Sequence, residues 1–170
     1  MPVARDFRFY AYQPARVVRC GRSIGRNFFW KLYAIENSFR VIVNSVLIVQ
    51  VDADWWAKAI SKKKQATLDQ RREDYTARPL HASPGKHDIY LLMLSDLTKL
   101  IGTYQDKFSP VVPDIDEWIV RLERIRLPRN LVGHMNFPNS YDRQRIDSAY
   151  ASLPVIFAHL HEKGIPLVIP

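Results

Sequence analysis

Cysteine is nearly absent from this chain of 170 residues, in which Cys20 is the single example. The chain therefore has no internal disulfide and no paired cysteines of the kind that build structural zinc sites. One thiol without an oxidised framework fits a reducing compartment, so we expect a cytoplasmic protein. The N-terminal residues show no apolar stretch after their charges, which argues against a secretory signal.

Long hydrophobic runs are also missing. The most apolar run, Val41 to Val51, is interrupted by three polar residues and is too short and too polar to span a bilayer. The last six residues, 165–170, are apolar but too short for an anchor, and we expect them to dock as a tail on the protein surface. No membrane partner is expected.

Glycine is scarce, with six residues, and no glycine-rich phosphate loop is present. The segment from Gly21 to Gly25 lacks the lysine and the spacing of a P-loop. An acidic cluster, Asp114, Asp116 and Glu117, falls at the start of a predicted helix, where capping and the helix dipole explain it. We therefore expect neither a cofactor nor a metal.

Acidic residues are in the minority, 17 against 25 lysines and arginines, which gives a formal net charge of +8 and a sequence pI near 9.7. That balance suits a polyanionic partner, of which nucleic acid is the commonest. The alternative interpretation is a soluble protein that is basic without binding nucleic acid.

Apolar residues recur at helical spacing along most of the chain, which predicts an all-α bundle. The helices are expected over residues 27–51, 54–76, 89–104, 114–127 and 142–161. Pro128 is expected to disturb the fourth of these helices, and Gly164 to end the last. Residues 1–26 show no helical period and are predicted to form an irregular basic arm with short extended pieces, followed by one helical domain over 27–170.

The segment from Arg129 to His134 carries the chemistry that stands out. An arginine can hold a phosphate in a bidentate fork, and a histidine can exchange a proton near neutral pH. Together they suffice to cleave an RNA phosphodiester without a metal. The bare spacing is common by chance, but Asn130 directly after the arginine makes it more specific. The alternative is an arginine on a helix surface and a histidine that caps a carbonyl.

The motif resembles that of HEPN domains, a helical family whose ribonuclease members carry Arg-x(4–6)-His, often with a polar residue after the arginine. Arg129, Asn130 and His134 match this pattern. Residues 33–40, Tyr-Ala-Ile-Glu-Asn-Ser-Phe-Arg, look like the family's ENxxR start. The similarity covers about residues 27–161.

Two further segments, Trp55-Trp56 and Leu94-Ser95-Asp96-Leu97, are similar to HEPN branches found in bacterial toxins and defence proteins. The resemblance implies a HEPN-like bundle and a metal-independent endoribonuclease. It also implies a homodimer whose two motifs meet across one cleft, with an antitoxin or another regulatory partner.

In the expected reaction, a ribose 2′-hydroxyl attacks the adjacent phosphate and leaves a 2′,3′-cyclic phosphate and a 5′-hydroxyl. His134 acts as general base or general acid, and Arg129 stabilises the charge on the pentacoordinate phosphate. Residues five apart lie about 140° apart on an ideal helix, so the two side chains need not face one point within a subunit. Two copies related by a two-fold axis can supply a composite site.

Other residues are expected to support this site. Asn130 either donates to a phosphate oxygen or fixes the histidine tautomer, with a local cap as the alternative. Glu36 either lies beneath Arg129 and orients it or forms an ion pair along its own helix face. The expected RNA contacts, for which a solvated charged face is the alternative, are Arg40, Arg126, Lys62, Lys63 and Lys64.

The sequence thus predicts an endoribonuclease of the HEPN type that acts as a toxin or phage-defence effector. A catalytically silent HEPN module that binds RNA, nucleotide or a protein partner is the alternative. A purely structural helical protein is the third hypothesis. The other four histidines have no partner at a catalytic spacing and are expected in loops or on the surface: His81, His87, His159 and His161.

Overall fold

The computed structural model describes residues 6–78, 80 and 82–170. Within these residues the chain forms helices and no strand, as the all-α prediction expected. The first five residues of the predicted arm, with Pro79 and His81, lie outside the described residues. The elements are η1 (Phe7–Phe9), α1 (Pro14–Ile24), the π-helix η2 (Gly25–Phe29), α2 (Trp30–Gln50), α3 (Trp55–Ala59), α4 (Lys62–Thr76), η3 (Asp88–Leu91), α5 (Leu94–Thr103), α6 (Gln105–Phe108), α7 (Ile115–Gly133) and α8 (Ser140–Glu162).

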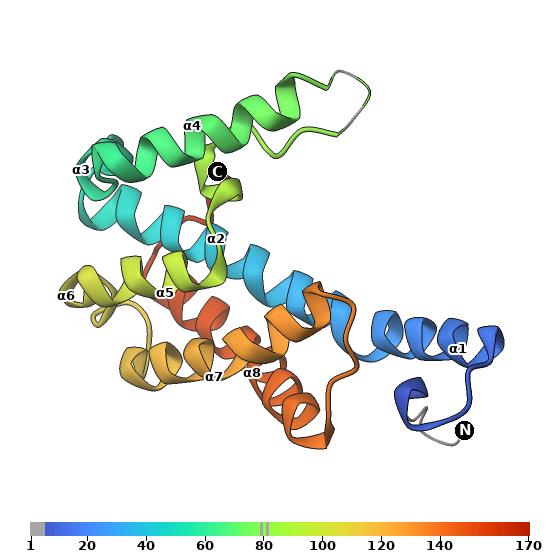
Figure 1. Cartoon of the computed structure of the whole chain (residues 1–170). Coiled ribbons are helices and arrows are strands. Elements are labelled where there is room, and N and C mark those ends of the chain that lie inside the picture. The colour runs from blue at the N-terminus through green and yellow to red at the C-terminus, as the bar shows by residue number, and fades with distance from the viewer. Residues whose placement is uncertain (1–5, 79, 81) are drawn as a thin grey trace.

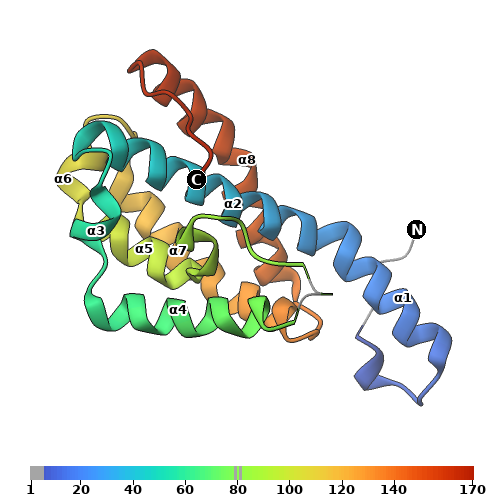
Figure 2. The same cartoon turned by 90° about the horizontal axis from the view of Figure 1, so that it is seen from above.

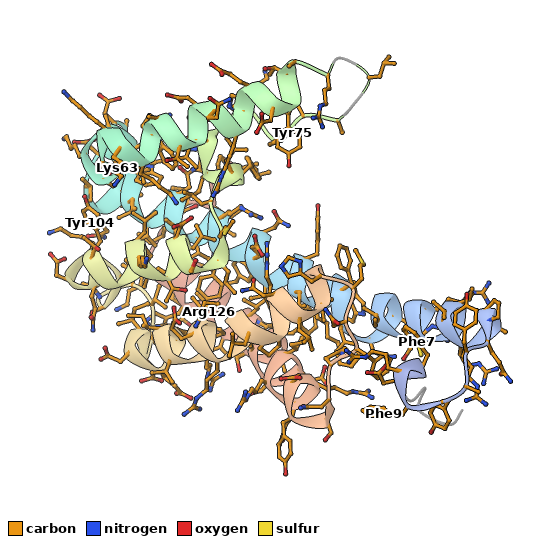
Figure 3. All side chains as sticks on the ribbon, viewed as in Figure 1. Phe7, Phe9, Lys63, Tyr75, Tyr104 and Arg126 are labelled. Carbon is orange, nitrogen blue, oxygen red and sulfur yellow. The ribbon has the colours of Figure 1, made fainter. Side chains whose placement is uncertain are left out.

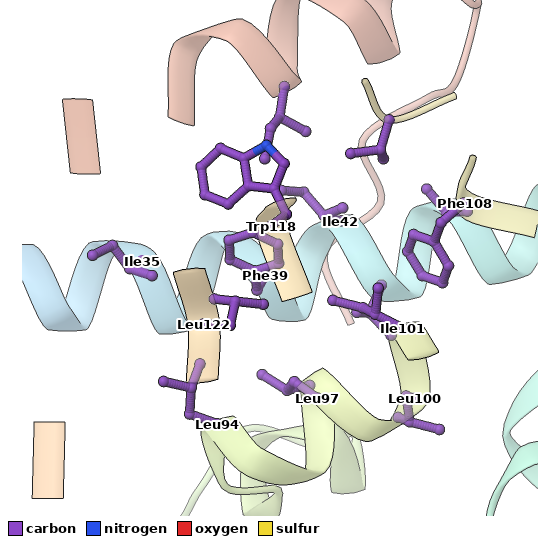
Figure 4. Close-up of a cluster of buried hydrophobic side chains, with 14 of the residues drawn as sticks. Ile35, Phe39, Ile42, Leu94, Leu97, Leu100, Ile101, Phe108, Trp118 and Leu122 are labelled. Atoms are coloured by element: carbon purple, nitrogen blue, oxygen red, sulfur yellow. The ribbon is translucent and has the colours of Figure 1, made fainter. Parts of the chain in front are cut away.

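Helix α2 runs through the middle of the molecule, and α5 and α8 pack on it while α7 packs on both of those helices (Figures 1 and 2). Figure 4 shows the core where α2, α5 and α7 meet, with Phe39 and Trp118 in tilted ring contact at 5.4 Å. The apolar residues that recur at helical spacing along α2, which are Leu32, Ile35, Phe39, Ile42 and Val46, are buried, whereas Val49 near its end is 46% exposed. The ring contact places the start of α7 beside the middle of α2.

The prediction of an irregular N-terminal arm was wrong for residues 14–26. Pro14 occupies the first turn of α1, where its missing N–H costs nothing, and the helix continues through η2 into α2. Cys20 is the one buried residue of α1. Figure 1 shows α1 projecting from the bundle. Val17, Cys20 and Ile24 recur at helical spacing and form the more buried side of α1, a short period that the prediction missed.

The continuous helix Pro14–Gln50 is long and apolar enough, by length and composition alone, to cross a membrane. Of the most apolar stretch of 18 residues in this helix, 61% is buried inside the fold. A mostly buried core helix passes the same test, and α2, the second part of this helix, is in contact with α5 and α8.

Two predicted helices are divided by local capping. Ser61 ends the extended link after α3, and its Oγ accepts the amide hydrogen of Lys64 at 3.2 Å, which starts α4 as a separate helix. The predicted helix over 89–104 begins instead at α5, where the Asp96 carboxylate accepts the backbone N–H of Met93 at 3.1 Å. The segment before it forms η3.

Helix α7 does not end near Pro128 but continues through it to Gly133. The proline removes one backbone hydrogen bond, yet Pro128 itself is buried, as are Ile125 and Val132 on either side of it. Packing of these residues in the core therefore keeps α7 helical past Pro128. Gly164 ends α8 with a φ of 68°, as its position predicted.

The C-terminal tail docks on α2, which confirms the prediction for residues 165–170. The Val168 amide donates to Ser45 Oγ at 2.8 Å, and Asn44 Nδ2 donates to the Val168 carbonyl at 3.0 Å. Ile165 is buried. The tail also explains why the polar Ser45 is fully buried.

Candidate functional site

The Arg129 guanidinium from α7 meets the Glu36 carboxylate from α2. Arg129 Nε donates to Glu36 Oε2 at 2.9 Å, and Nη2 donates to Oε1 at 3.3 Å. This two-point contact fixes the plane of the guanidinium. The predicted position of Glu36 beside Arg129 is confirmed, and the alternative ion pair along its own helix face is present as well, to Arg40 at 2.6 Å.

Arg40 does not lie on the surface where an RNA contact was expected. It is buried, and its donors reach Glu36 Oε1, Asn37 Oδ1 at 3.0 Å, and the carbonyls of Ile89 and Leu92 at 3.3 and 3.1 Å. A guanidinium with this many acceptors is held rigidly. Its role is to neutralise Glu36 and to tie the segment from η3 to α5 onto α2.

One carboxylate therefore lies between two guanidinium groups, and the three side chains carry a net charge of +1. The Arg129 side chain is 33% exposed, whereas those of Glu36 and Arg40 are 10% and 11% exposed. The excess positive charge thus reaches solvent at Arg129. Its Nη1 lies 3.5 Å from Asn130 Oδ1 and over Gly133, and this edge is the one that Glu36 does not occupy.

His134 follows the last turn of α7. Its backbone N–H donates to the Asn130 carbonyl at 2.9 Å, and its side chain is exposed. Among the residues that the structure describes, the His134 ring has no hydrogen-bond partner. Asn130 is exposed beside Arg129, so its amide does not fix the tautomer of His134 within the subunit.

The turn after His134 is held on both sides. Met135 has a φ of 61°, and the amides of Met135 and Asn136 donate to the carbonyls of Val132 and Leu131 at 3.0 and 2.9 Å. This is the hydrogen-bond pattern that closes a helix at a left-handed residue. It fixes where the His134 backbone leaves the helix.

Sequence analysis missed a contact from the N-terminal segment to this turn. Arg8 Nη1 donates to Asn136 Oδ1 at 3.3 Å, and Asn136 Nδ2 donates to the His134 carbonyl at 3.1 Å. Arg8 is itself fixed by Asp6 through Nε and Nη2. Nothing in the sequence connects residues 128 positions apart.

The three lysines expected to contact RNA lie on α4, a different helix from Arg129, whereas Arg126 lies one turn before Arg129 on α7. Arg126 lies on α7 and pairs with Glu123 at 3.1 Å, while Lys63 lies at the α3 end of α4, a helix that packs on η3 (Figure 3). Lys62 is exposed beside it, and Lys64 pairs with Asp96 at 2.8 Å. The lysines therefore form a separate charged surface.

His87 lies in the loop before η3, as expected, but it is half-buried against the rings of Trp55 and Trp56. Burial lowers the pKa of His87, and its Nδ1 accepts the Ile89 amide at 3.1 Å. The ring is thus a neutral structural element of the α3–η3 packing and not a second catalytic histidine.

No group of three or more histidine, cysteine, aspartate or glutamate side chains in the described part of the chain could hold a metal ion. Comparisons with models of protein families, with curated proteins and with solved structures found no match.

Proposed function

We propose that this protein is a metal-independent endoribonuclease of the HEPN type, in which Arg129 and His134 are the catalytic residues. The observation that carries the proposal is the two-point contact of Glu36 with Arg129, which leaves the Nη1 edge of the guanidinium towards Asn130 and Gly133 in the turn of α7 that precedes His134. The basic composition of the chain adds support for a polyanionic substrate.

In the proposed reaction, the edge of Arg129 that Glu36 does not occupy binds a non-bridging phosphate oxygen. Because Glu36 and the buried Arg40 hold Arg129 in place before substrate arrives, little reorganisation is needed as charge develops on the phosphate. His134 removes the proton of the ribose 2′-hydroxyl or protonates the 5′-oxygen that leaves. The products are a 2′,3′-cyclic phosphate and a 5′-hydroxyl.

A second copy of the chain supplies the other proton-transfer group. Exposed apolar side chains lie near the site on α2 and after α7. Tyr33, one turn before Glu36 on α2, is 65% exposed, and Met135, directly after His134, is 78% exposed. Apolar surface next to charged catalytic groups is typical of an interface. A two-fold axis through this region would bring two His134 rings to one phosphate.

The test is cleavage of a mixed RNA pool by purified protein in excess EDTA, with Arg129→Ala and His134→Ala in parallel. We expect cleavage by the wild type, cyclic-phosphate ends, and loss of activity in both variants. If cleavage requires added metal, or survives in both variants, the proposal is wrong. Adding excess His134→Ala protein to the wild type tests the composite site, because a mixed dimer holds a single His134 ring and should lose activity, whereas independent subunits would keep theirs.

A catalytically silent module that binds RNA, nucleotide or a protein partner is the second candidate. The observation that favours it is the exposed His134 ring, which no group in the described residues orients. This candidate predicts salt-dependent RNA binding with no cleavage by the wild-type dimer.

The toxin or phage-defence role is the cellular part of the same proposal. It predicts that expression of the wild-type protein arrests growth of a bacterial host and that His134→Ala does not.

A further inference from the structure

A groove of about 760 Å³ begins three residues after His134. Its walls come from the N-terminal segment around Arg8, from the π-helix η2, and from residues 137–143 at the start of α8. The volume lies within the range of about 300–1,000 Å³ that is typical of small-molecule sites. Short π-helical turns such as η2 are frequent at functional sites. We refer to this feature as the N-terminal groove.

Aromatic side chains line the N-terminal groove from three directions. Phe28 and Phe137 form its inner wall, in an edge contact with ring centroids 6.4 Å apart. Phe9 and Tyr10 lie on the outer side and are 81% and 42% exposed. Phe9 is labelled in Figure 3 on the segment that precedes α1. Exposed aromatic rings above an apolar wall form the kind of surface on which nucleobases stack.

The charge around the N-terminal groove suits a polyanion. Two arginines, Arg8 and Arg143, line the groove with one acidic residue, Asp6, which pairs with Arg8. The adjoining residues 14–35 add five basic and no acidic residues, although none of these five lines the groove. Arg143, which lines the groove, is 43% exposed and pairs through Nε with Asp147 at 3.4 Å, and no described residue bonds its two Nη groups. These cations favour a phosphate-bearing ligand over an apolar peptide.

Two hydrogen bonds, and a short stretch of chain, connect the groove to the catalytic motif. Arg8, on the groove wall, donates to Asn136, which donates to the His134 carbonyl. Three Cα steps separate His134 from Phe137, a reach of at most about 11 Å. A single RNA strand that presents a phosphate to Arg129 and His134 can therefore place a neighbouring base in the groove.

We propose that the N-terminal groove holds an unpaired base of the RNA next to the phosphate that is cut, and so sets the sequence preference of the enzyme. The inference rests on the proposed ribonuclease function in that it takes RNA as the ligand. Phe9 and Tyr10 stack on the base, and Arg143 contacts the strand that enters the groove.

The test measures binding without cleavage. Short single-stranded 2′-O-methyl oligoribonucleotides of A, C, G or U lack the attacking hydroxyl, so the wild-type protein can be titrated by fluorescence anisotropy. A strand with one abasic position is the ligand control. The test variant is Phe9→Ala/Tyr10→Ala. The matched protein control is Tyr12→Ala, because Tyr12 belongs to the same segment, is 75% exposed and does not line the groove.

We expect the double variant to bind the preferred oligonucleotide about 5- to 100-fold more weakly than the wild type, because removing an aromatic ring on which a base stacks usually lowers affinity by about this factor. Tyr12→Ala should bind like the wild type, and the abasic strand should not distinguish the proteins. Equal binding by the double variant, with an unchanged circular dichroism spectrum, would overturn the proposal. A shift in sedimentation with unchanged RNA binding would also overturn it, since the groove would then serve self-association. Base-dependent binding through the groove in a protein that never cleaves RNA would support the groove and refute the ribonuclease.

Discussion

Glu36→Gln is the perturbation that best separates the roles of the central side chains. Glutamine keeps the shape of glutamate and one oxygen acceptor but removes the charge that lies between Arg40 and Arg129. Arg129 is 33% exposed and can turn to water, whereas the Arg40 side chain is 11% exposed and cannot. The variant therefore leaves one guanidinium buried without a counter-charge.

Removing one partner of a buried ion pair usually costs about 3–5 kcal/mol. The retained oxygen of glutamine and the carbonyls of Ile89 and Leu92 still accept from Arg40, so we expect the lower end, about 3 kcal/mol. For a chain of this length, each kcal/mol lowers Tm by about 2–4 °C, so the expected fall is about 6–12 °C.

Thermal unfolding followed by circular dichroism is the assay. Glu117→Gln is the matched control, because Glu117 pairs with Arg121 at 2.5 Å along one helix, but its side chain is 58% exposed. An exposed pair of this kind contributes less than about 1 kcal/mol, so its Tm should change by no more than about 4 °C. If Glu36→Gln lowers Tm no more than Glu117→Gln does, Arg40 does not depend on Glu36 and the reasoning is refuted.

The remaining predictions concern stability. Met135→Gly should raise Tm by about 2–4 °C, because the φ of 61° costs a side chain about 1 kcal/mol; an unchanged or lower Tm would contradict this. Because the pKa of His87 lies below its ordinary value of 6.5, the unfolded chain binds a proton more readily, so stability should be full above about pH 6.5 and fall towards pH 5. His87→Asn, which keeps an acceptor for the Ile89 amide, should flatten that pH dependence in urea titrations, and an equally steep profile would count against the assignment. In the wild type, the buried Trp55 Nε1–H donates to Asn44 Oδ1 at 3.2 Å, and Asn44→Ala removes that acceptor. The free energy of unfolding measured in urea should therefore fall by about 1–3 kcal/mol. A fall of less than about 0.5 kcal/mol, as for a surface substitution, would contradict this.

The parts of the fold that follow from apolar spacing could be predicted from the sequence. The stripe of α7, with Trp118, Leu122 and Ile125 buried, required only a regular period. The end of α7 could not be predicted in the same way. Pro128 signals a break locally, but burial on the core outweighs the one hydrogen bond that proline removes.

At the candidate site, the pairing of Glu36 with Arg129 could be expected because a fixed arginine plane needs a carboxylate partner. The burial of Arg40 could not, since an arginine one turn after a glutamate usually indicates an exposed pair. Its acceptors on Ile89 and Leu92 are backbone carbonyls about fifty residues away, as the separations of 49 and 52 show. Only the packed tertiary structure brings them to Arg40.

The most direct measurement of the central claim is the single-turnover rate of RNA cleavage in EDTA for the wild type and for His134→Ala. Because the His134 side chain is exposed, the substitution should leave Tm unchanged. We predict a fall in rate of about 10²–10⁴-fold, the usual contribution of a general acid or base. Cleavage by His134→Ala at the wild-type rate, with an equally stable fold, would contradict the assignment of catalysis to the Arg129–His134 motif.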